Sequence, residues 1–222
     1  MRGMGWRLVT VGAMCAMAAC TMHLDKPVVV RRGDAARSIY LVDGAVRMDA
    51  QARARKVHTV DGDITLDRWA QASALRSVDG AIVMAGGASC SGDVHSVDGR
   101  IDLGDGVRVG GNVGSLTGDV EVRDALVEGR LETISGRIRL SGKTHVDQGI
   151  VLSMPNPRAD DADQKRLPVV VIGPGVVVGG RIVARRGGTL MVSRRASIGP
   201  VEGIRVQWFD GAMPPPAAGA AK

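Results

Sequence analysis

The sequence predicts an all-β fold, a right-handed parallel β-helix (β-solenoid) with rungs of 18–19 residues. Two observations lead to this fold class: a short motif ending in glycine recurs at an almost fixed period, and apolar residues alternate with polar ones after each motif. The recurring glycines are Gly44, Gly62, Gly80, Gly99, Gly118 and Gly136, so the successive steps are 18, 18, 19, 19 and 18 residues. Composition agrees, because a chain with 2% aromatic residues lacks the large side chains on which globular cores rely.

Each repeat is expected to hold about three short strands separated by turns. Strict alternation, as in the pair Ile64 and Leu66 after Gly62, is the period of a β-strand, and no stretch follows the period of a helix. Apolar positions also keep their distance from the glycine. Five residues before it lie Ile39, Val57, Leu75, Val94, Val113 and Leu131, and eight residues after it lie Ala52, Ala70, Ala88, Val107, Leu126 and Thr144. Parallel stacking of equivalent strands would bury these positions jointly, which one repeat cannot do alone.

The glycine is expected to be the structural residue of each turn. Turns that end in Asp-Gly, Thr-Gly or Ser-Gly favour a residue that tolerates positive φ, and glycine does so without a Cβ penalty. A hydroxyl column lies three residues before the glycines: Thr59, Ser77, Ser96, Ser115 and Thr133. No His–acid pair recurs beside these hydroxyls, so we expect them to support the turn rather than to act as nucleophiles.

Residues 1–19 have the order of a signal peptide. Arg2 and Arg7 precede an apolar stretch that is too short for a stable membrane anchor. The sequence Met-Ala-Ala-Cys at 17–20 resembles a bacterial lipoprotein signal, in which small residues precede a cysteine that is acylated and becomes the mature N-terminus. The resemblance implies lipidation of Cys20 and a membrane as partner, with the outer membrane favoured because Thr21, not Asp, follows. The alternative is an ordinary secretory signal in which Cys20 is incidental.

Five segments follow the predicted signal peptide. They are a tether at 20–27, solenoid repeats at 28–153, a polar loop at 154–168, terminal rungs and a cap at 169–210, and a disordered tail at 211–222. Pro155, Pro157 and Pro168 mark the loop, because proline cannot donate a hydrogen bond to a β-ladder. The tail is rich in Pro and Ala, as is typical of segments that form no core.

The charge pattern argues against nucleic acid as a partner. The formal net charge is +6, and export would remove two arginines and no acidic residue, which leaves +4 (29 less 2, against 23). The basic residues are scattered, and the few aromatic residues offer no platform for stacked bases.

Four aspartates form a candidate ligand column: Asp43, Asp61, Asp79 and Asp98. Carboxylates one rung apart repel one another, and a hard cation such as Ca²⁺ could bridge them. The simpler interpretation is that aspartate is a good turn residue, since the repeat lacks the nonapeptide of calcium-binding β-rolls. We therefore predict no metal site, no cofactor and no catalytic residue.

Two histidines and one cysteine are further candidates for reactive groups. His58 and His95 share a column with Arg76 between them, so they lie roughly 9–10 Å apart, too far to bind one metal. Cys90 occupies the column of Ala54, Ala72 and Val109, which predicts a small buried thiol; a reactive or intermolecular thiol is the alternative.

The repeated Ser-Val-Asp-Gly-x-Ile-x-Leu unit resembles the adhesin-like β-solenoid domains of bacterial envelopes, whose rungs carry a Ser-Val-x-Gly-x-Ile motif. The similarity covers roughly residues 28–153. Residues 169–203 look like rungs of the polymer-forming bactofilins. Both resemblances imply a solenoid fold, and neither family has catalytic residues to transfer to this chain.

These observations predict a non-catalytic cell-envelope lipoprotein, a structural or adhesin-like solenoid that could self-associate. The alternative is a module that binds envelope polysaccharide or a cation along the Asp-Gly column. A pectin-cleaving enzyme is the third hypothesis; the turns are too short to build a catalytic groove, and aromatic platforms for sugar rings are expected to be missing.

Overall fold

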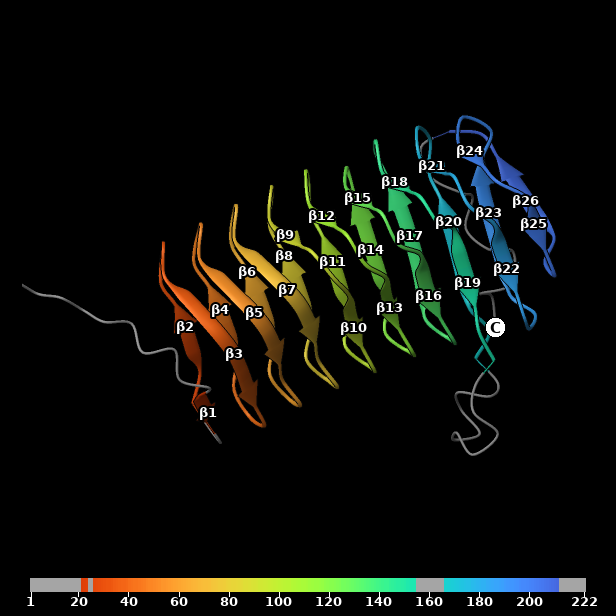
Figure 1. Ribbon diagram of the computed structural model, residues 1–222. Helices are drawn as coiled ribbons and strands as arrows, with labels where there is room; N and C mark the ends of the chain where they lie inside the picture. The colour runs from red at the N-terminus through yellow and green to blue at the C-terminus, as the bar shows by residue number, and fades with distance from the viewer. Residues whose placement is uncertain (1–20, 24–25, 155–165, 212–222) are drawn as a thin grey trace, which may run out of the picture.

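The chain folds as a parallel β-solenoid, which confirms the predicted fold class. The computed structural model describes residues 21–23, 26–154 and 166–211. All regular elements of these ranges are strands, and each strand pairs in parallel with its equivalents in neighbouring rungs. Figure 1 shows the rungs succeeding one another along a single axis, from the red N-terminal strands to the blue C-terminal ones.

A ten-stranded sheet forms one face of the solenoid. Its strands, in spatial order, are β2 (Val28–Val30), β4 (Val46–Met48), β6 (Ile64–Leu66), β8 (Ile82–Met84), β11 (Ile101–Leu103), β14 (Val120–Arg123), β17 (Arg137–Ser141), β20 (Val169–Ile172), β23 (Thr189–Ser193) and β26 (Val206–Phe209). These are the strands predicted after each glycine. Their side chains alternate between the core and solvent, as the sequence pattern requires.

A sixteen-stranded sheet forms the rest of the wall, and it branches. It begins with β1 (Thr21–His23), β3 (Ala35–Leu41), β5 (Arg53–His58) and β7 (Gln71–Arg76). One branch continues as β9 (Ser89–Cys90), β12 (Arg108–Val109), β15 (Leu126–Val127), β18 (His145–Val146), β21 (Val177–Val178) and β24 (Ser197–Ile198). The other continues as β10 (Val94–Ser96), β13 (Val113–Ser115), β16 (Leu131–Thr133), β19 (Ile150–Leu152), β22 (Ile182–Ala184) and β25 (Val201–Glu202).

One extra residue causes the branching at β7. Ala72 pairs with Cys90, an offset of 18 residues, whereas Leu75 pairs with Val94, an offset of 19. The additional residue therefore lies within 91–93, where it breaks one long strand into two. The prediction of three strands per rung holds only beyond this point, and the first rungs have two strands because their long strand runs without a break.

The core side chains become larger beyond the point where the wall branches. One inward column of the branched sheet runs, in register, through Ala36, Ala54, Ala72, Cys90, Val109, Val127, Val146, Val178 and Ile198. Small side chains thus fill this column in the N-terminal rungs, and larger branched side chains fill it in the rungs that follow. Apolar burial is continuous from Val30 to Val192, so the rungs share one core.

One predicted core position is wrong. Leu126 was expected in the column of Val107 and Thr144, but Ala125 is buried there and Leu126 is half-buried outside it. The reason is that the turn between Val122 and Val127 is one residue shorter than the equivalent turn of the preceding rung. Leu103 pairs with Val122 at an offset of 19, whereas Val109 pairs with Val127 at an offset of 18.

The segment predicted as a tether, 20–27, contains the short strand β1, which pairs in parallel with residues 39–41 of β3. Residues 1–20, most of the polar loop and the tail from 212 lie outside the described residues. The strands from Val169 onward add further rungs to the same ladders: β20 pairs with β17, and β23 with β20.

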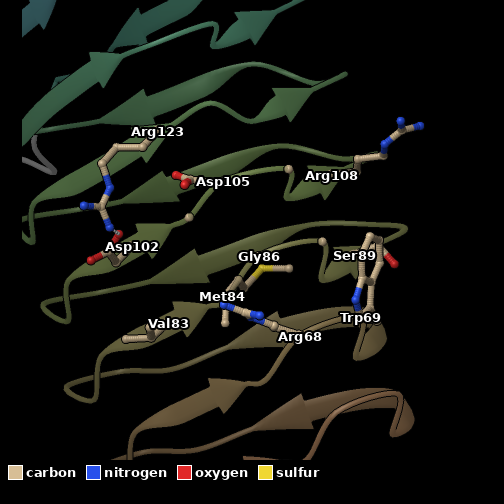
Figure 2. Close-up of a pocket in the computed structure, with 14 residues that line it drawn as sticks. Arg68, Trp69, Val83, Met84, Gly86, Ser89, Asp102, Asp105, Arg108 and Arg123 are labelled. Atoms are coloured by element: carbon tan, nitrogen blue, oxygen red, sulfur yellow. Dashed lines mark hydrogen bonds and ion pairs between the residues drawn. The ribbon is translucent and has the colours of Figure 1, made fainter.

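Backbone with positive φ recurs at the turn that follows the strands of the ten-stranded sheet in the first half of the solenoid. Register aligns Gly33, Gln51, Trp69, Gly87 and Gly106 in this position, and all five have φ between 63° and 79°. Glycine adopts this conformation without strain, whereas a bulky residue rarely does. Trp69 nevertheless occupies it, and its side chain is 62% exposed (Figure 2).

Removal of residues 169–222 should cause self-association. The deletion would leave β17, β18 and β19 without their partners β20, β21 and β22, so their backbone N–H and C=O groups would face solvent as an open edge. Light scattering should then report a higher mass than for the full chain. A chain that lacks only residues 212–222 keeps every described strand and is the control. A monomeric residue 1–168 chain, as heat-stable as its parent, would refute the capping role.

Candidate functional site

The recurring glycines lie one above another, and close backbone approach requires them. A Cβ placed on Gly80 would overlap the carbonyl oxygen of Gly62, and one on Gly99 would overlap that of Gly80. The same overlap recurs for Gly62 against Gly44, for Gly118 against Gly99 and for Gly136 against Gly118. The glycine column is therefore a site where any side chain would push two rungs apart.

The expected reason for these glycines is wrong. We predicted that the turn needs positive φ, but among the six glycines only Gly44 has it, at 129°. The other five adopt backbone conformations open to most residues. What excludes a side chain is the carbonyl group of the rung below, a contact between rungs that a single turn motif does not reveal.

The hydroxyl column supports the turn, as predicted. All five of its residues are buried, and Thr59 Oγ1 donates to Ser77 Oγ at 3.1 Å. Ser115 Oγ donates to the carbonyl oxygen of Val97 at 3.1 Å and accepts from the N–H of Gly118 at 3.0 Å. Thr133 accepts from the N–H of Gly136 in the same way. Ser96, Ser115 and Thr133 thus bond to backbone groups at the corner, while Thr59 and Ser77 bond to each other.

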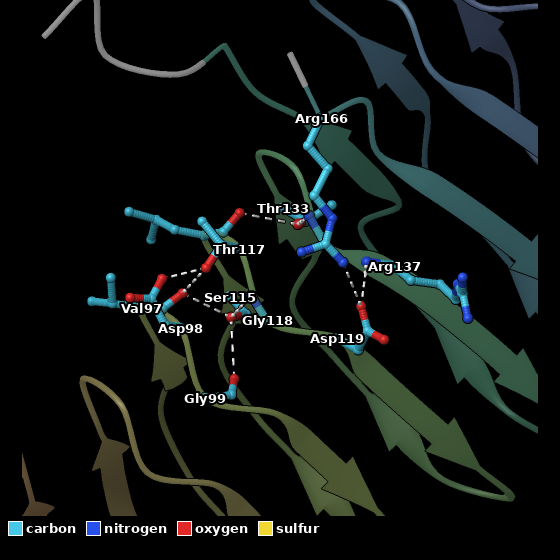
Figure 3. A network of polar contacts seen from close by, with 12 residues as sticks. Val97, Asp98, Gly99, Ser115, Thr117, Gly118, Asp119, Thr133, Arg137 and Arg166 are labelled. Atoms are coloured by element: carbon cyan, nitrogen blue, oxygen red, sulfur yellow. Dashed lines mark hydrogen bonds and ion pairs between the residues drawn. The ribbon is translucent and has the colours of Figure 1, made fainter. Parts of the chain in front are cut away.

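The Asp-Gly column lies at the surface. Asp43, Asp61, Asp79 and Asp98 are all exposed, and the N–H groups of the last three donate to the rung below. The carboxylate of Asp98 accepts from the hydroxyl of Thr117, the next residue of the column (Figure 3). Binding of a cation or polysaccharide along this column stays a prediction.

A second set of acidic and amide side chains links the rungs, and the sequence analysis missed it. Asp63 accepts from the N–H of Ala81 at 2.8 Å, and Asp119 accepts from that of Arg137 at 2.9 Å (Figure 3). At the other corner Asp93 accepts from Asn112, and Asn112 accepts from Arg130. The missed signal was the acidic residue directly after glycine, as in Asp-Gly-Asp at 61–63 and Thr-Gly-Asp at 117–119. These side chains act as ladder bonds.

The histidine column is assembled as predicted but is partly covered. Tyr40, His58, Arg76 and His95 are register partners, and the rings of Tyr40 and His58 lie with centroids 5.1 Å apart. Burial, with the nearby charges of Arg76 and Lys56, lowers the pKa of His58. A neutral imidazole beside cations fits a packing role for this column.

The structure confirms that Cys90 is a buried thiol. Its side chain is 1% exposed and lies in the predicted column. Burial raises the pKa of the Cys90 thiol to about 11. Since the thiolate is the reactive form, low solvent exposure and protonation of the thiol both make this cysteine slow to react.

Metal-binding clusters and membrane-spanning helices are two further kinds of functional feature that a chain can contain. Within the described ranges, no three His, Cys, Asp or Glu side chains come close enough together to hold a metal ion. The same ranges hold no helix with the length and apolar character needed to cross a membrane. Comparison with family models, with curated protein sequences and with solved structures finds no match to this chain.

Replacing Gly80 by alanine should destabilise the fold by about 1–3 kcal/mol, the usual penalty for forcing atoms into a packed interior. The added methyl group would overlap the backbone of Gly62, which no side-chain rotation can relieve. Urea unfolding followed by circular dichroism measures the change. Gly187→Ala is the matched control, because the nearest atom to its Cβ would be Leu167 Cδ2 at 4.0 Å. Equal midpoints for the two variants would contradict the steric explanation.

The Cys90 thiol should react with iodoacetamide at least ~10-fold more slowly in the folded chain than in the denatured chain at pH 8. At that pH the folded-state thiol is protonated, and its thiolate fraction increases only as the pH rises toward 11. Mass spectrometry of the Cys90 peptide measures the rate site by site. The Cys90→Ala variant gives the background from Cys15 and Cys20. Similar rates in the folded and denatured chains would show that Cys90 is accessible.

Proposed function

We propose that this chain is an exported, non-catalytic protein of the cell envelope, held to a membrane by lipid on Cys20, whose solenoid acts as a structural or adhesin-like element. The observation that carries the proposal is that several polar side chains recurring in the repeats bond to the backbone of the solenoid. The hydroxyl column bonds to turn amides and carbonyls, and Asp63 and Asp119 bond to amides of the next rung.

A structural role is supported by the uniform wall that these contacts build. The ladders run through every rung, one apolar core fills the interior, and the corners are short. Such a body presents extended surfaces at fixed spacing, which suits contact with a large or repetitive partner. The basic, apolar and small residues that precede Cys20 support export and lipidation.

A Cys20→Ala variant should move the protein from the membrane fraction to the soluble fraction, or arrest its processing. The acyl chains supply the anchoring energy, about 0.8 kcal/mol for each buried CH₂ group, so removing their attachment site removes the anchor. Fractionation of cells with immunoblotting measures the distribution, and mass spectrometry identifies the mature N-terminus. Cys15→Ala is the control and should leave anchoring intact. Normal cleavage and membrane retention of the Cys20→Ala variant would refute the proposal.

A further inference from the structure

Trp69 is an exposed indole that packs against the next rung of the solenoid. It has positive φ at a turn where its register neighbours are Gln51 and Gly87, and local strain of this kind is characteristic of functional positions. One face of the ring packs on Gly87, where an added Cβ would lie 2.6 Å from the indole. The glycine thus admits the ring, and the ring remains 62% exposed (Figure 2).

A polar column runs next to this ring across four rungs: Arg53, Gln71, Ser89 and Arg108 are register partners on β5, β7, β9 and β12. All four side chains point outward, because the residues that follow them in sequence are buried. Three rungs separate the two arginines, a span of roughly 14 Å from the strand spacing. Two cations thus flank an amide and a hydroxyl that can donate and accept hydrogen bonds.

Two depressions meet at the tryptophan. One, of about 520 Å³, is lined by Gly33, Gln51, Arg53, Trp69 and Gln71. The other, of about 950 Å³, also contains Trp69 and brings in Arg68, Ser89 and Arg108 (Figure 2). The indole and the polar column therefore border a continuous, shallow and open surface, as an extended ligand would need.

The arginines that border this surface differ from those of the ten-stranded sheet in their ion pairs. On the ten-stranded sheet the arginines are paired: Arg100 bonds to Asp102 and Glu121, and Arg123 bonds to Asp102. By contrast, the side chains of Arg53, Arg68 and Arg108 form no ion pair with any residue that the structure describes. Asp105 is the one carboxylate of the larger depression that no described arginine neutralises. A third depression along the same column is lined by Arg53, Arg108 and Glu128, so Glu128 adds a second carboxylate. Three guanidinium groups therefore face two carboxylates, Asp105 and Glu128, and the surface keeps a cationic excess.

We propose that Trp69 and the column Arg53–Gln71–Ser89–Arg108 bind an acidic polysaccharide. The electron-rich face of the indole attracts the C–H groups of a sugar ring, and guanidinium groups pair with carboxylate, sulfate or phosphate substituents. Gln71 and Ser89 bond to sugar hydroxyls between the two charges. The site lies on a different corner from the Asp-Gly column and is independent of the lipid anchor. A lipid surface fits less well, because the ring lies against its own rungs beside a groove.

Calorimetric titration of the full chain tests the proposal. The probes are an oligogalacturonate, which carries carboxylates, a chondroitin sulfate oligosaccharide, which adds sulfate groups, and neutral laminarin. We expect binding to at least one acidic glycan, weaker binding as NaCl is raised, and no binding to laminarin. The acidic probe that binds more tightly identifies the favoured anion. Failure of both acidic glycans to bind would overturn the proposal.

The variant that isolates the ring is Trp69→Gly, because glycine tolerates the positive φ of this turn and occupies it in the next rung, at Gly87. We expect at least a tenfold rise in Kd with an unchanged melting temperature. Trp208→Ala, which alters an exposed tryptophan of the last strand, is the control and should not change Kd. Arg53→Gln and Arg108→Gln test the column separately, each with a several-fold rise in Kd.

Three results would contradict the site. Equal affinity of Trp69→Gly and the parent would show that binding is general electrostatic attraction. Unchanged affinity of both arginine variants would place the anion elsewhere. Binding to phosphatidylglycerol vesicles that depends on Trp69, without binding to either glycan, would assign the surface to a membrane instead.

Discussion

The register between successive rungs is the constraint on which the rest of this structure depends. Parallel pairing sets each residue above its equivalent, one strand spacing (about 4.8 Å) along the axis, so every column meets only its own kind of neighbour. Apolar columns then bury one another, hydroxyls reach the turn backbone, and glycines allow two carbonyl-bearing turns to come close. A slip of one residue would turn the alternate side chains of every strand outward.

Much of the fold could be predicted because two sequence patterns follow from this register: the repeat period of the glycine motif and the alternation of apolar and polar residues. The glycine steps give the length of each rung, and the residues at fixed distances from glycine prove to be buried, except Leu126. A step length, however, does not say where in the rung a residue is gained or lost. The gain within 91–93 and the shortened turn before Ala125 both follow from local geometry, and both changed the predicted strands or core.

The candidate site was harder to predict, since a repeat directs attention to what recurs. The recurring serines, threonines and glycines prove to stabilise the stacking of the rungs. Turn propensities suggested that the glycines have positive φ, but what requires glycine is the close approach of the carbonyl group in the rung below. The residue with the most unusual environment is a departure from the pattern. Trp69 stands in line with Gly33, Gln51, Gly87 and Gly106, and a bulky aromatic residue in a column where glycine predominates was the available signal.

The column that changes from alanine to valine also makes the solenoid uneven along its axis. The early rungs have alanine in this column, at Ala54 and Ala72, and later rungs have valine, at Val109 and Val127. Each valine buries two more carbon atoms than alanine, and each buried carbon stabilises the fold by about 0.8 kcal/mol. The contribution of this column to stability therefore increases along the axis, since each rung of a stack is stabilised by the core that it shares with its neighbours.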